Sequence, residues 1–320
     1  MMTTIKKILR RSETGVLVPL LLLWIVTGCF NKNFFSSMSM SSLFRSVSIT
    51  MLGSIGVTFV FSCGMMDLSM GAIYGLSSMV AALLMVNHGV HTAIAMLAGI
   101  LVAAIFGLLN GIIINKLTLP AFITTLGTQY IGRGIVNVIS SGKQVSGLPQ
   151  NFTVLGTKGP LGLYWSIYIA IVFAIIAALV LKYSVYGRSL LAVGGNQETA
   201  RTCGINVHRV RNIAFVICSV MAALSGMMSA ARLGAVQATS GTGIEMVVIA
   251  GTVIGGVSMY GGASSILGAA IGVTIMETLT VSMTMIRINA YWQNIVVGII
   301  IIVAVAIDTL RRKKLSGGKG

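Results

Sequence analysis

The stretch "MLGSIGVTFVFSCGMMDLSMGAIYGLSSMVAALLMV" (residues 51–86) decides how this chain must fold. Its residues are almost all apolar or small, and Asp67 is the one charged side chain among them. A helix needs about 20 apolar residues to cross the hydrocarbon core of a bilayer. With residues 47–50 the stretch is long enough for two such helices, and Gly64 and Gly71 flank Asp67 near its middle. It therefore predicts two membrane spans with a joint at Asp67.

The whole chain of 320 residues shares this character, because 56% of its residues are hydrophobic and only 9% are charged. A soluble domain usually carries about 25% charged residues. Apolar segments recur at residues 16–30, 47–65, 68–86, 92–115, 121–139, 164–182, 212–231, 245–258, 266–285 and 291–309. We therefore predict an all-α polytopic membrane protein with about 8–10 transmembrane helices, in which residues 1–320 form a single transmembrane domain.

Two of these segments, 68–86 and 245–258, are interrupted by glycine, and the second is also short. Backbone groups freed by glycine inside a bilayer are tolerated only where protein or water satisfies them. We therefore expect one or two broken or re-entrant segments. The glycines expected to have a structural role there are Gly64, Gly71, Gly255, Gly256, Gly261 and Gly262.

The formal net charge of +16 is concentrated at the two ends of the chain and in one loop. The basic clusters are Lys6, Lys7, Arg10 and Arg11, then "RRKK" (311–314), and the loop 183–211. Cytoplasmic segments of membrane proteins carry such an excess of Lys and Arg. An even number of spans places all three clusters on one side, so both termini and loop 183–211 are predicted to be cytoplasmic. The charge then reflects topology, and we expect no nucleic acid as a partner.

The sequence lacks common catalytic and metal-binding motifs. It contains no G-x-x-x-x-G-K-[ST] loop for ATP phosphates, no H-E-x-x-H and no G-x-S-x-G. Its four cysteines, Cys29, Cys63, Cys203 and Cys218, lack metal-site spacing. We therefore expect a protein that is not an enzyme and binds no metal or nucleotide itself.

Loop 183–211 has the signals of a short capped helix followed by a tight turn. Asn196 is placed to cap a helix, and Glu198 favours the positive end of its dipole. Gly204 suits a left-handed exit, and Asn206 is placed to cap the next helix, which runs into the seventh span. These signals alone leave two interpretations open, a simple connector and a docking element.

Four motifs follow one another along the chain: "GMMDLSMG" (64–71), "LPAFITTLGTQYIGRGI" (119–135), "AVGGNQETARTCGINV" (192–207) and "GTGIEMVVIAGTVIGGVSMYGGASSILGAAIG" (241–272). Together they resemble the membrane subunits of ribose-type ABC importers, the permeases for pentoses, hexoses and autoinducer sugars. The resemblance covers most of residues 47–312. The chain departs from the third motif at Thr199, where Ala is usual, and at Cys203, where Ser is common.

The resemblance implies a permease of the bacterial cytoplasmic (inner) membrane that imports a small sugar by alternating access. A separate cytoplasmic ATPase would bind ATP and Mg²⁺, an extracytoplasmic sugar-binding protein would deliver the solute, and a second permease copy or a paralogue would complete the assembly. It also implies that loop 183–211 docks the ATPase. The residues carried over for that coupling role are Gly194, Gly195, Asn196, Glu198, Arg201, Gly204, Asn206 and Arg209.

Polar side chains inside predicted spans are candidates for the translocation path or for gating, because an ionisable group in the membrane is costly. These candidates are Asp67, Asn110, Thr125, Asn137, Glu245 and Glu277. Asp67 also precedes an apolar run that begins at Leu68, so it is equally placed to cap a helix there. An alternative function is a proton-coupled secondary transporter that uses Asp67 and Glu277.

Overall fold

The computed structural model describes residues 12–316, and a helix covers each predicted apolar segment. These helices are α2 (Ser12–Phe30), α3 (Ser37–Ser62), α4 (Met70–Asn87), α5 (Thr92–Leu117), α6 (Ala121–Ser140), α8 (Trp165–Tyr183), α11 (Val207–Leu233), α12 (Ile244–Ile254), α13 (Ile266–Met285) and α14 (Ala290–Ser316). Within the described residues, α3, α4, α5, α8, α11 and α13 are long and apolar enough to cross a membrane. The predicted all-α polytopic fold is confirmed.

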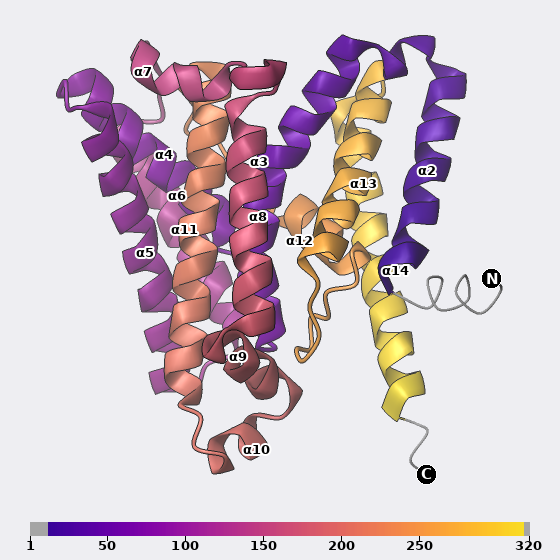
Figure 1. Ribbon diagram of the computed structural model, residues 1–320. Coiled ribbons are helices and arrows are strands. Elements are labelled where there is room, and N and C mark those ends of the chain that lie inside the picture. Colours follow the sequence, from indigo (N-terminus) through magenta and orange to yellow (C-terminus); the bar gives the residue numbers. More distant parts are fainter. Residues whose placement is uncertain (1–11, 317–320) are drawn as a thin grey trace.

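Shorter elements gather at the two ends of the helices (Figure 1). They are η1 (Lys32–Phe35), β1 (Val145–Ser146), α7 (Gln150–Thr153), η2 (Val154–Gly156), η3 (Pro160–Gly162), α9 (Val185–Gly195), α10 (Gln197–Thr202) and β2 (Ala235–Val236). Strands β1 and β2 pair antiparallel, with Val145 opposite Val236. This small ribbon joins the loop after α6 to the segment that follows α11.

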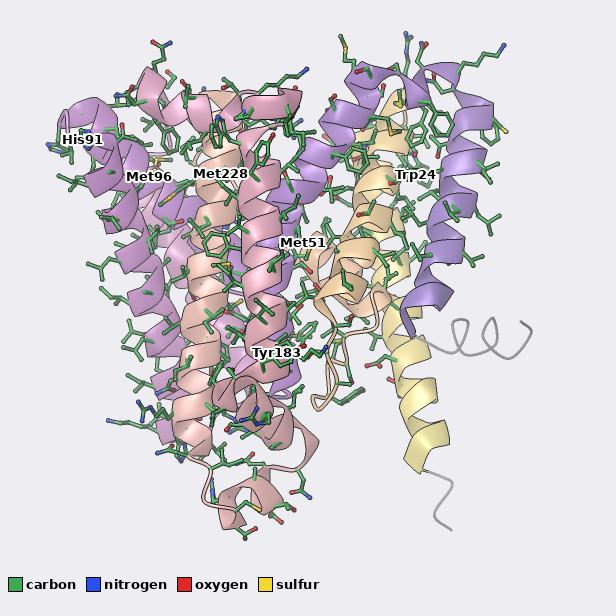
Figure 2. All side chains as sticks on the ribbon, viewed as in Figure 1. Trp24, Met51, His91, Met96, Tyr183 and Met228 are labelled. Carbon is green, nitrogen blue, oxygen red and sulfur yellow. The ribbon has the colours of Figure 1, made fainter. Side chains whose placement is uncertain are left out.

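Helix α3 lies at the centre of the fold and packs against α8, α11, α12 and α13. Every residue from Ser48 to Ser62 is buried. Small residues permit this close packing, since a Cβ at Gly56 would lie 2.8 Å from the Cα of Cys218 in α11. In contrast, α5 and α8 expose leucine and isoleucine side chains, such as Leu101 and Ile175. Figure 2 shows side chains of α5 pointing away from the other helices. The exposed faces of these two helices suit contact with lipid.

Both segments expected to be broken are interrupted. Residues 63–69 are irregular between α3 and α4. Helix α12 has only 11 residues, which at 1.5 Å per residue is about half the thickness of a bilayer core. Irregular backbone precedes and follows it. The predicted helix start at Leu68 is wrong by two residues, because α4 begins at Met70 with Ser69 as its N-cap residue.

The α9–α10 region and the C-terminal end of α14 lie at the same end of the molecule (Figure 1). This agrees with the expected even number of spans, and the basic residues of loop 183–211 are the basis of the prediction that this end is cytoplasmic. The basic residues at positions 6, 7, 10 and 11 lie outside the described residues, as do the side chains at 311–314.

Candidate translocation and coupling sites

One face of α6 carries Thr125, Gln129 and Arg133, which are spaced by four residues and therefore share a side of the helix. The hydroxyl of Thr125 accepts a hydrogen bond from the backbone N–H of Leu68 at 3.2 Å, in the irregular joint before α4. The amide of Gln129 donates to Glu245 Oε1 at 2.8 Å, in the first turn of α12. This polar stripe of α6, defined by Thr125, Gln129 and Arg133, thus contacts both broken segments.

Arg133 joins the two broken segments directly. Its guanidinium donates to the carbonyl of Gly71 at 2.9 Å, in the first turn of α4, and to the carbonyl of Ser240, just before α12. Glu245 is buried, and a Cβ at Gly71 would lie 2.0 Å from its Oε2 atom. Glycine at position 71 therefore makes room for the carboxylate, and the beginnings of α4 and α12 meet against α6.

Asp67 is buried in a polar cluster at the α3–α4 joint. Its Oδ1 atom accepts hydrogen bonds from the backbone N–H of Ser69 at 2.9 Å and from the Ser69 hydroxyl at 2.6 Å. Asn110 of α5 donates to the same hydroxyl at 2.8 Å, and the Cys218 thiol of α11 lies beside the carboxyl group. Asp67 Oδ2 and Asn110 Oδ1 are buried without a hydrogen-bond partner. Asp67 thus holds a turn ahead of α4 rather than capping a helix that starts at Leu68.

Glu277 and Asn137 lie apart from this cluster. Glu277 of α13 is partly buried, and its Oε1 atom accepts a hydrogen bond from the Thr50 hydroxyl of α3 at 2.6 Å. Asn137 is exposed near the end of α6. The two carboxylates of the proton-transport hypothesis, Asp67 and Glu277, therefore have separate sets of partners.

Loop 183–211 contains the predicted caps and one helix more than predicted. Asn196 Oδ1 accepts the N–H of Thr199 at 3.0 Å at the start of α10, and Asn206 Oδ1 accepts the N–H of Arg209 at 3.0 Å at the start of α11. Gly204 has a φ of 81°, as a left-handed exit requires. The additional helix is α9, whose N-terminus is capped by Ser184 through the N–H of Gly187.

A contact made entirely of small groups joins this loop to the membrane helices. A Cβ at Gly194 would lie 2.0 Å from the carbonyl oxygen of Ser62, at the end of α3, and 2.6 Å from the N atom of Gly262. Gly262 itself donates its N–H to Ser62 O at 3.1 Å. A Cβ at Gly64 would lie 3.1 Å from the carbonyl oxygen of Tyr260. The end of α9 therefore contacts the end of α3 and the segment after α12, and the segment after α3 meets the segment after α12 through Gly64 and Tyr260.

The other predicted structural glycines also mark close approaches or turns. A Cβ at Gly255 would lie 2.2 Å from Gly268 O of α13, and Gly256 and Gly261 have φ values of 87° and 88°. Of the residues proposed for ATPase coupling, Gly194 is half-buried, and the others are exposed on loop 183–211, namely Gly195, Asn196, Glu198, Arg201, Gly204, Asn206 and Arg209. Their exposure leaves them accessible to a partner protein.

Sequence reasoning missed Gln129, Ser69 and Cys218 as members of these clusters, and it noted Arg133 only as part of a motif. The spacing of four residues from Thr125 to Gln129 to Arg133 was the available signal. No local pattern indicates that Cys218, in α11, lies beside Asp67.

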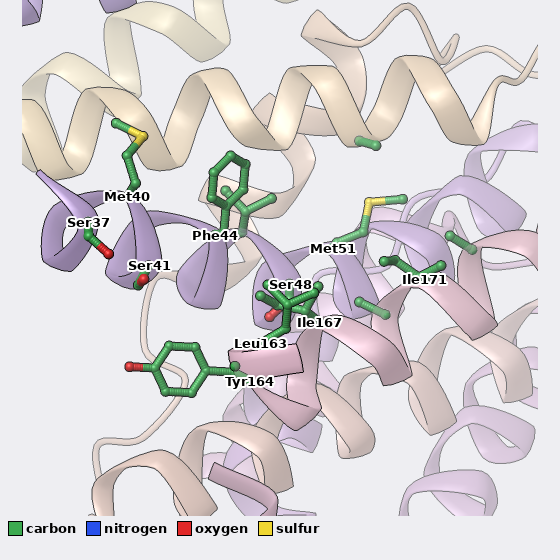
Figure 3. Close-up of a pocket in the computed structure, with 15 residues that line it drawn as sticks. Ser37, Met40, Ser41, Phe44, Ser48, Met51, Leu163, Tyr164, Ile167 and Ile171 are labelled. Atoms are coloured by element: carbon green, nitrogen blue, oxygen red, sulfur yellow. The ribbon is translucent and has the colours of Figure 1, made fainter. Parts of the chain in front are cut away.

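A groove of about 540 Å³ lies between α3 and α8 at the end opposite α9 (Figure 3). Its walls include Met40, Phe44, Met51 and Ile167. This mainly apolar lining suits a hydrocarbon chain better than a polar solute. We therefore do not place the solute path in this groove.

Comparison with known proteins matches residues 39–305 to the family described as "Branched-chain amino acid transport system / permease component". The chain belongs to this family of import permeases. It is a multi-pass protein of the inner membrane. The autoinducer 2 import system permease protein LsrC of Escherichia coli O157:H7 is 30% identical over 304 residues, which cover 95% of this chain and 89% of the relative.

Two LsrC proteins of Yersinia are similarly related. That of Yersinia pseudotuberculosis is 31% identical, with 95% of this chain and 86% of the relative covered. That of Yersinia enterocolitica is 33% identical, with 92% and 82% covered. No solved structure matches the chain. These relatives confirm the resemblance to ABC importer permeases that the motifs indicated.

Proposed function

We propose that this chain is the permease subunit of an ATP-driven importer for a small sugar or sugar-like solute. A separate cytoplasmic ATPase binds ATP and Mg²⁺, and an extracytoplasmic binding protein delivers the solute. The family membership supports the importer, and the autoinducer 2 relatives support the sugar-like solute. The family description names branched-chain amino acids, which makes them the second candidate class of solute.

The observation that carries the proposal is the contact of α9 with the end of α3 and with the segment after α12, through Gly194, Ser62 and Gly262. Any displacement of α9 by a docked ATPase is transmitted to these segments, because the contact has no flexible side chain between the backbones. The segment after α3 continues into α4, whereas Gly262 lies in the segment that follows the last turn of α12. Arg133 donates to Gly71 in the first turn of α4 and to Ser240 just before α12. Movement at the cytoplasmic loop is thereby linked to the polar stripe of α6.

The face of α6 opposite the polar stripe is the proposed site of the second permease copy or paralogue. It exposes Ile123, Tyr130 and Ile131. A Cβ added at Gly127 or Gly134 would meet nothing within 4 Å. Because small residues allow helix backbones to approach closely in lipid, this face suits a helix of a neighbouring subunit.

Uptake in reconstituted vesicles tests the importer. We expect accumulation of a labelled sugar from a panel of pentoses, hexoses and autoinducer sugars only with ATP, the ATPase and the binding protein. Accumulation driven by a proton gradient without the ATPase would refute the proposal and favour the alternative with Asp67 and Glu277. Uptake of labelled leucine or valine under the same conditions, without uptake of any of the sugars, would transfer the proposal to the second solute class.

Charge reversal at Arg201 or Arg209 tests the docking role of the cytoplasmic loop. Both side chains are exposed, so we expect Arg201→Glu and Arg209→Glu to fold normally and to weaken capture of the ATPase. The matched control is Lys143→Glu, an equal change at an exposed residue beyond the far end of α6. Unchanged capture by both arginine variants would contradict this role.

A further inference from the structure

A second cavity, of about 630 Å³, opens near the α9–α10 end of the molecule. It lies between the end of α5, the α5–α6 turn, α10 and the start of α11, and residues Gly64 and Met66 form part of its wall. Its polar side chains are Asn115, Thr118, Gln197, Arg201, His208 and Arg211. The cavity is thus separate from the polar stripe of α6 and from the groove beside α8.

The charge of this cavity is positive. Arg201 and Arg211 both line it, and they repel each other electrostatically. None of the described residues that line it is acidic, and Glu198, on the same helix as Arg201, is not part of the wall. Two guanidinium groups facing one cavity without a lining carboxylate favour an anionic ligand, which would neutralise both charges.

The hydrogen-bonding groups in the wall are incompletely used. Arg211 donates from Nη2 to Gln197 Oε1 at 2.6 Å, whereas its Nε–H is buried without a partner. Asn115 is only 9% exposed, and its amide donates to the carbonyl of His208 at 3.1 Å and faces the side-chain amide of Asn212 at 2.6 Å. A guanidinium has more N–H donors than the contact with Gln197 uses, which leaves donors of Arg211 for a ligand in the cavity.

We propose that this cavity binds a small anion carrying a phosphate group, such as a phosphorylated sugar from the cytoplasm. The phosphate group carries close to two negative charges at neutral pH and has three acceptor oxygens, which match Arg201, Arg211 and His208. A volume of about 630 Å³ is larger than inorganic phosphate needs, and Met66, Leu119 and other apolar wall residues leave room for a carbon skeleton. The headgroup of an anionic phospholipid has the same chemistry and is the second possible source.

Bound phosphate would join α10, the α5–α6 turn and α11 into one rigid unit. The polar stripe of α6 follows directly after that turn, and α10 follows directly after α9. Binding therefore opposes relative movement of the cytoplasmic loop and α6, so a cytoplasmic phosphate ester slows import. This consequence rests on the proposed function, whereas the binding itself does not.

Thermal unfolding of the purified permease without the ATPase tests binding. The probes are ribose 5-phosphate and inorganic phosphate, with ribose and potassium chloride at matched ionic strength as controls. Ligand binding to the folded state raises the melting temperature, and we expect a rise of about 2–4 °C with ribose 5-phosphate at saturating concentration. Arg211→Gln is expected to weaken the apparent affinity by about tenfold or more, because it removes charge-assisted hydrogen bonds.

Arg209→Gln is the matched control, since it removes the same charge from the same helix, and Arg209 does not line the cavity. It is expected to retain the wild-type shift. Equal shifts in wild type, Arg211→Gln and Arg209→Gln would indicate non-specific ionic binding and overturn the proposal. Another outcome is that phosphatidylglycerol nanodiscs raise the melting temperature in a way that depends on Arg211 while ribose 5-phosphate does not. That result would assign the bound phosphate group to a lipid headgroup. No Arg211-dependent shift with either source would refute the site.

The functional consequence is measured in vesicles that import the labelled sugar. Ribose 5-phosphate sealed inside the vesicles is expected to slow sugar uptake by the wild-type permease. For Arg211→Gln, uptake with internal ribose 5-phosphate is expected to be close to the uptake of the same variant without it. Absence of all uptake would count against the proposed function, whereas normal uptake that is insensitive to internal ribose 5-phosphate would count against the regulatory role alone.

Discussion

Alanine at Gly194 should disrupt the contact between the cytoplasmic loop and the membrane helices. The new Cβ would lie 2.0 Å from Ser62 O and 2.6 Å from Gly262 N, both of which are backbone atoms that no rotamer change moves aside. Gly195 provides a matched control on the same helix, since a Cβ there would meet nothing within 4 Å. Neither glycine has a positive φ, so backbone strain does not distinguish them.

The expected magnitude follows from two terms. Alanine in place of glycine within a helix stabilises it by about 0.5–1 kcal/mol, and this term applies to both variants. Overpacking costs about 1–3 kcal/mol and applies to Gly194→Ala alone. The two variants should therefore differ in stability by about 1–3 kcal/mol, or by about 2–12 °C in melting temperature at about 2–4 °C per kcal/mol.

The assay is thermal unfolding of each purified variant without the ATPase, so that docking does not affect the result. Sugar uptake with the ATPase is then measured, and Gly194→Ala is expected to hydrolyse ATP with reduced uptake because α9 no longer seats on Ser62 and Gly262. Equal melting temperatures for Gly194→Ala and Gly195→Ala would refute the steric reasoning. A destabilised Gly194→Ala with fully coupled uptake would refute the mechanical role.

Three further substitutions test the interior clusters. Asp67→Ala removes both hydrogen bonds from Ser69 and should lower the free energy of unfolding by about 1–3 kcal/mol. Asp67→Asn retains an acceptor oxygen and should lower it less. Equal losses of stability in thermal unfolding would contradict this role. Arg133→Met should lower the free energy of unfolding by about 1–3 kcal/mol, because each interior hydrogen bond in a membrane protein contributes about 0.6–1.7 kcal/mol. It should also reduce uptake in vesicles more than Arg133→Lys does. Gly71→Ala should destabilise the fold by about 1–3 kcal/mol through its clash with Glu245, whereas Gly127→Ala on open helix surface should not; similar unfolding curves would argue against the clash.

Much of the fold is predictable because its causes are local. A run of about 20 apolar residues in a bilayer must satisfy its own backbone hydrogen bonds, and a helix does so within the segment. The caps at Asn196 and Asn206 and the left-handed Gly204 depend on neighbours within a few residues. Helix α9 escaped prediction because "VYGRSLLAVGG" contains three glycines, which weaken helical propensity.

The clusters inside the molecule depend on packing between distant parts of the chain. Asp67 was identifiable as an unusual charge, but its neighbour Cys218 comes from α11, far along the sequence. Glu245 was a candidate for the translocation path by its place in a predicted span, and only the approach of Gly71 and Gln129 gives it its partners in the interior. Asn137 was a candidate by span position, and the orientation of α6 leaves it exposed.

The sequence by itself determined the membrane class, the helices, the cytoplasmic loop and the family, because hydrophobic length, charge bias and motif order are properties of short segments read in succession. The tertiary structure decided which polar groups meet: α6 against both broken segments, Gly194 against Ser62 and Gly262, and Arg201 beside Arg211. The physical reason is that small residues allow backbones from separate helices to approach, and which backbones do so depends on the packing of all the helices together.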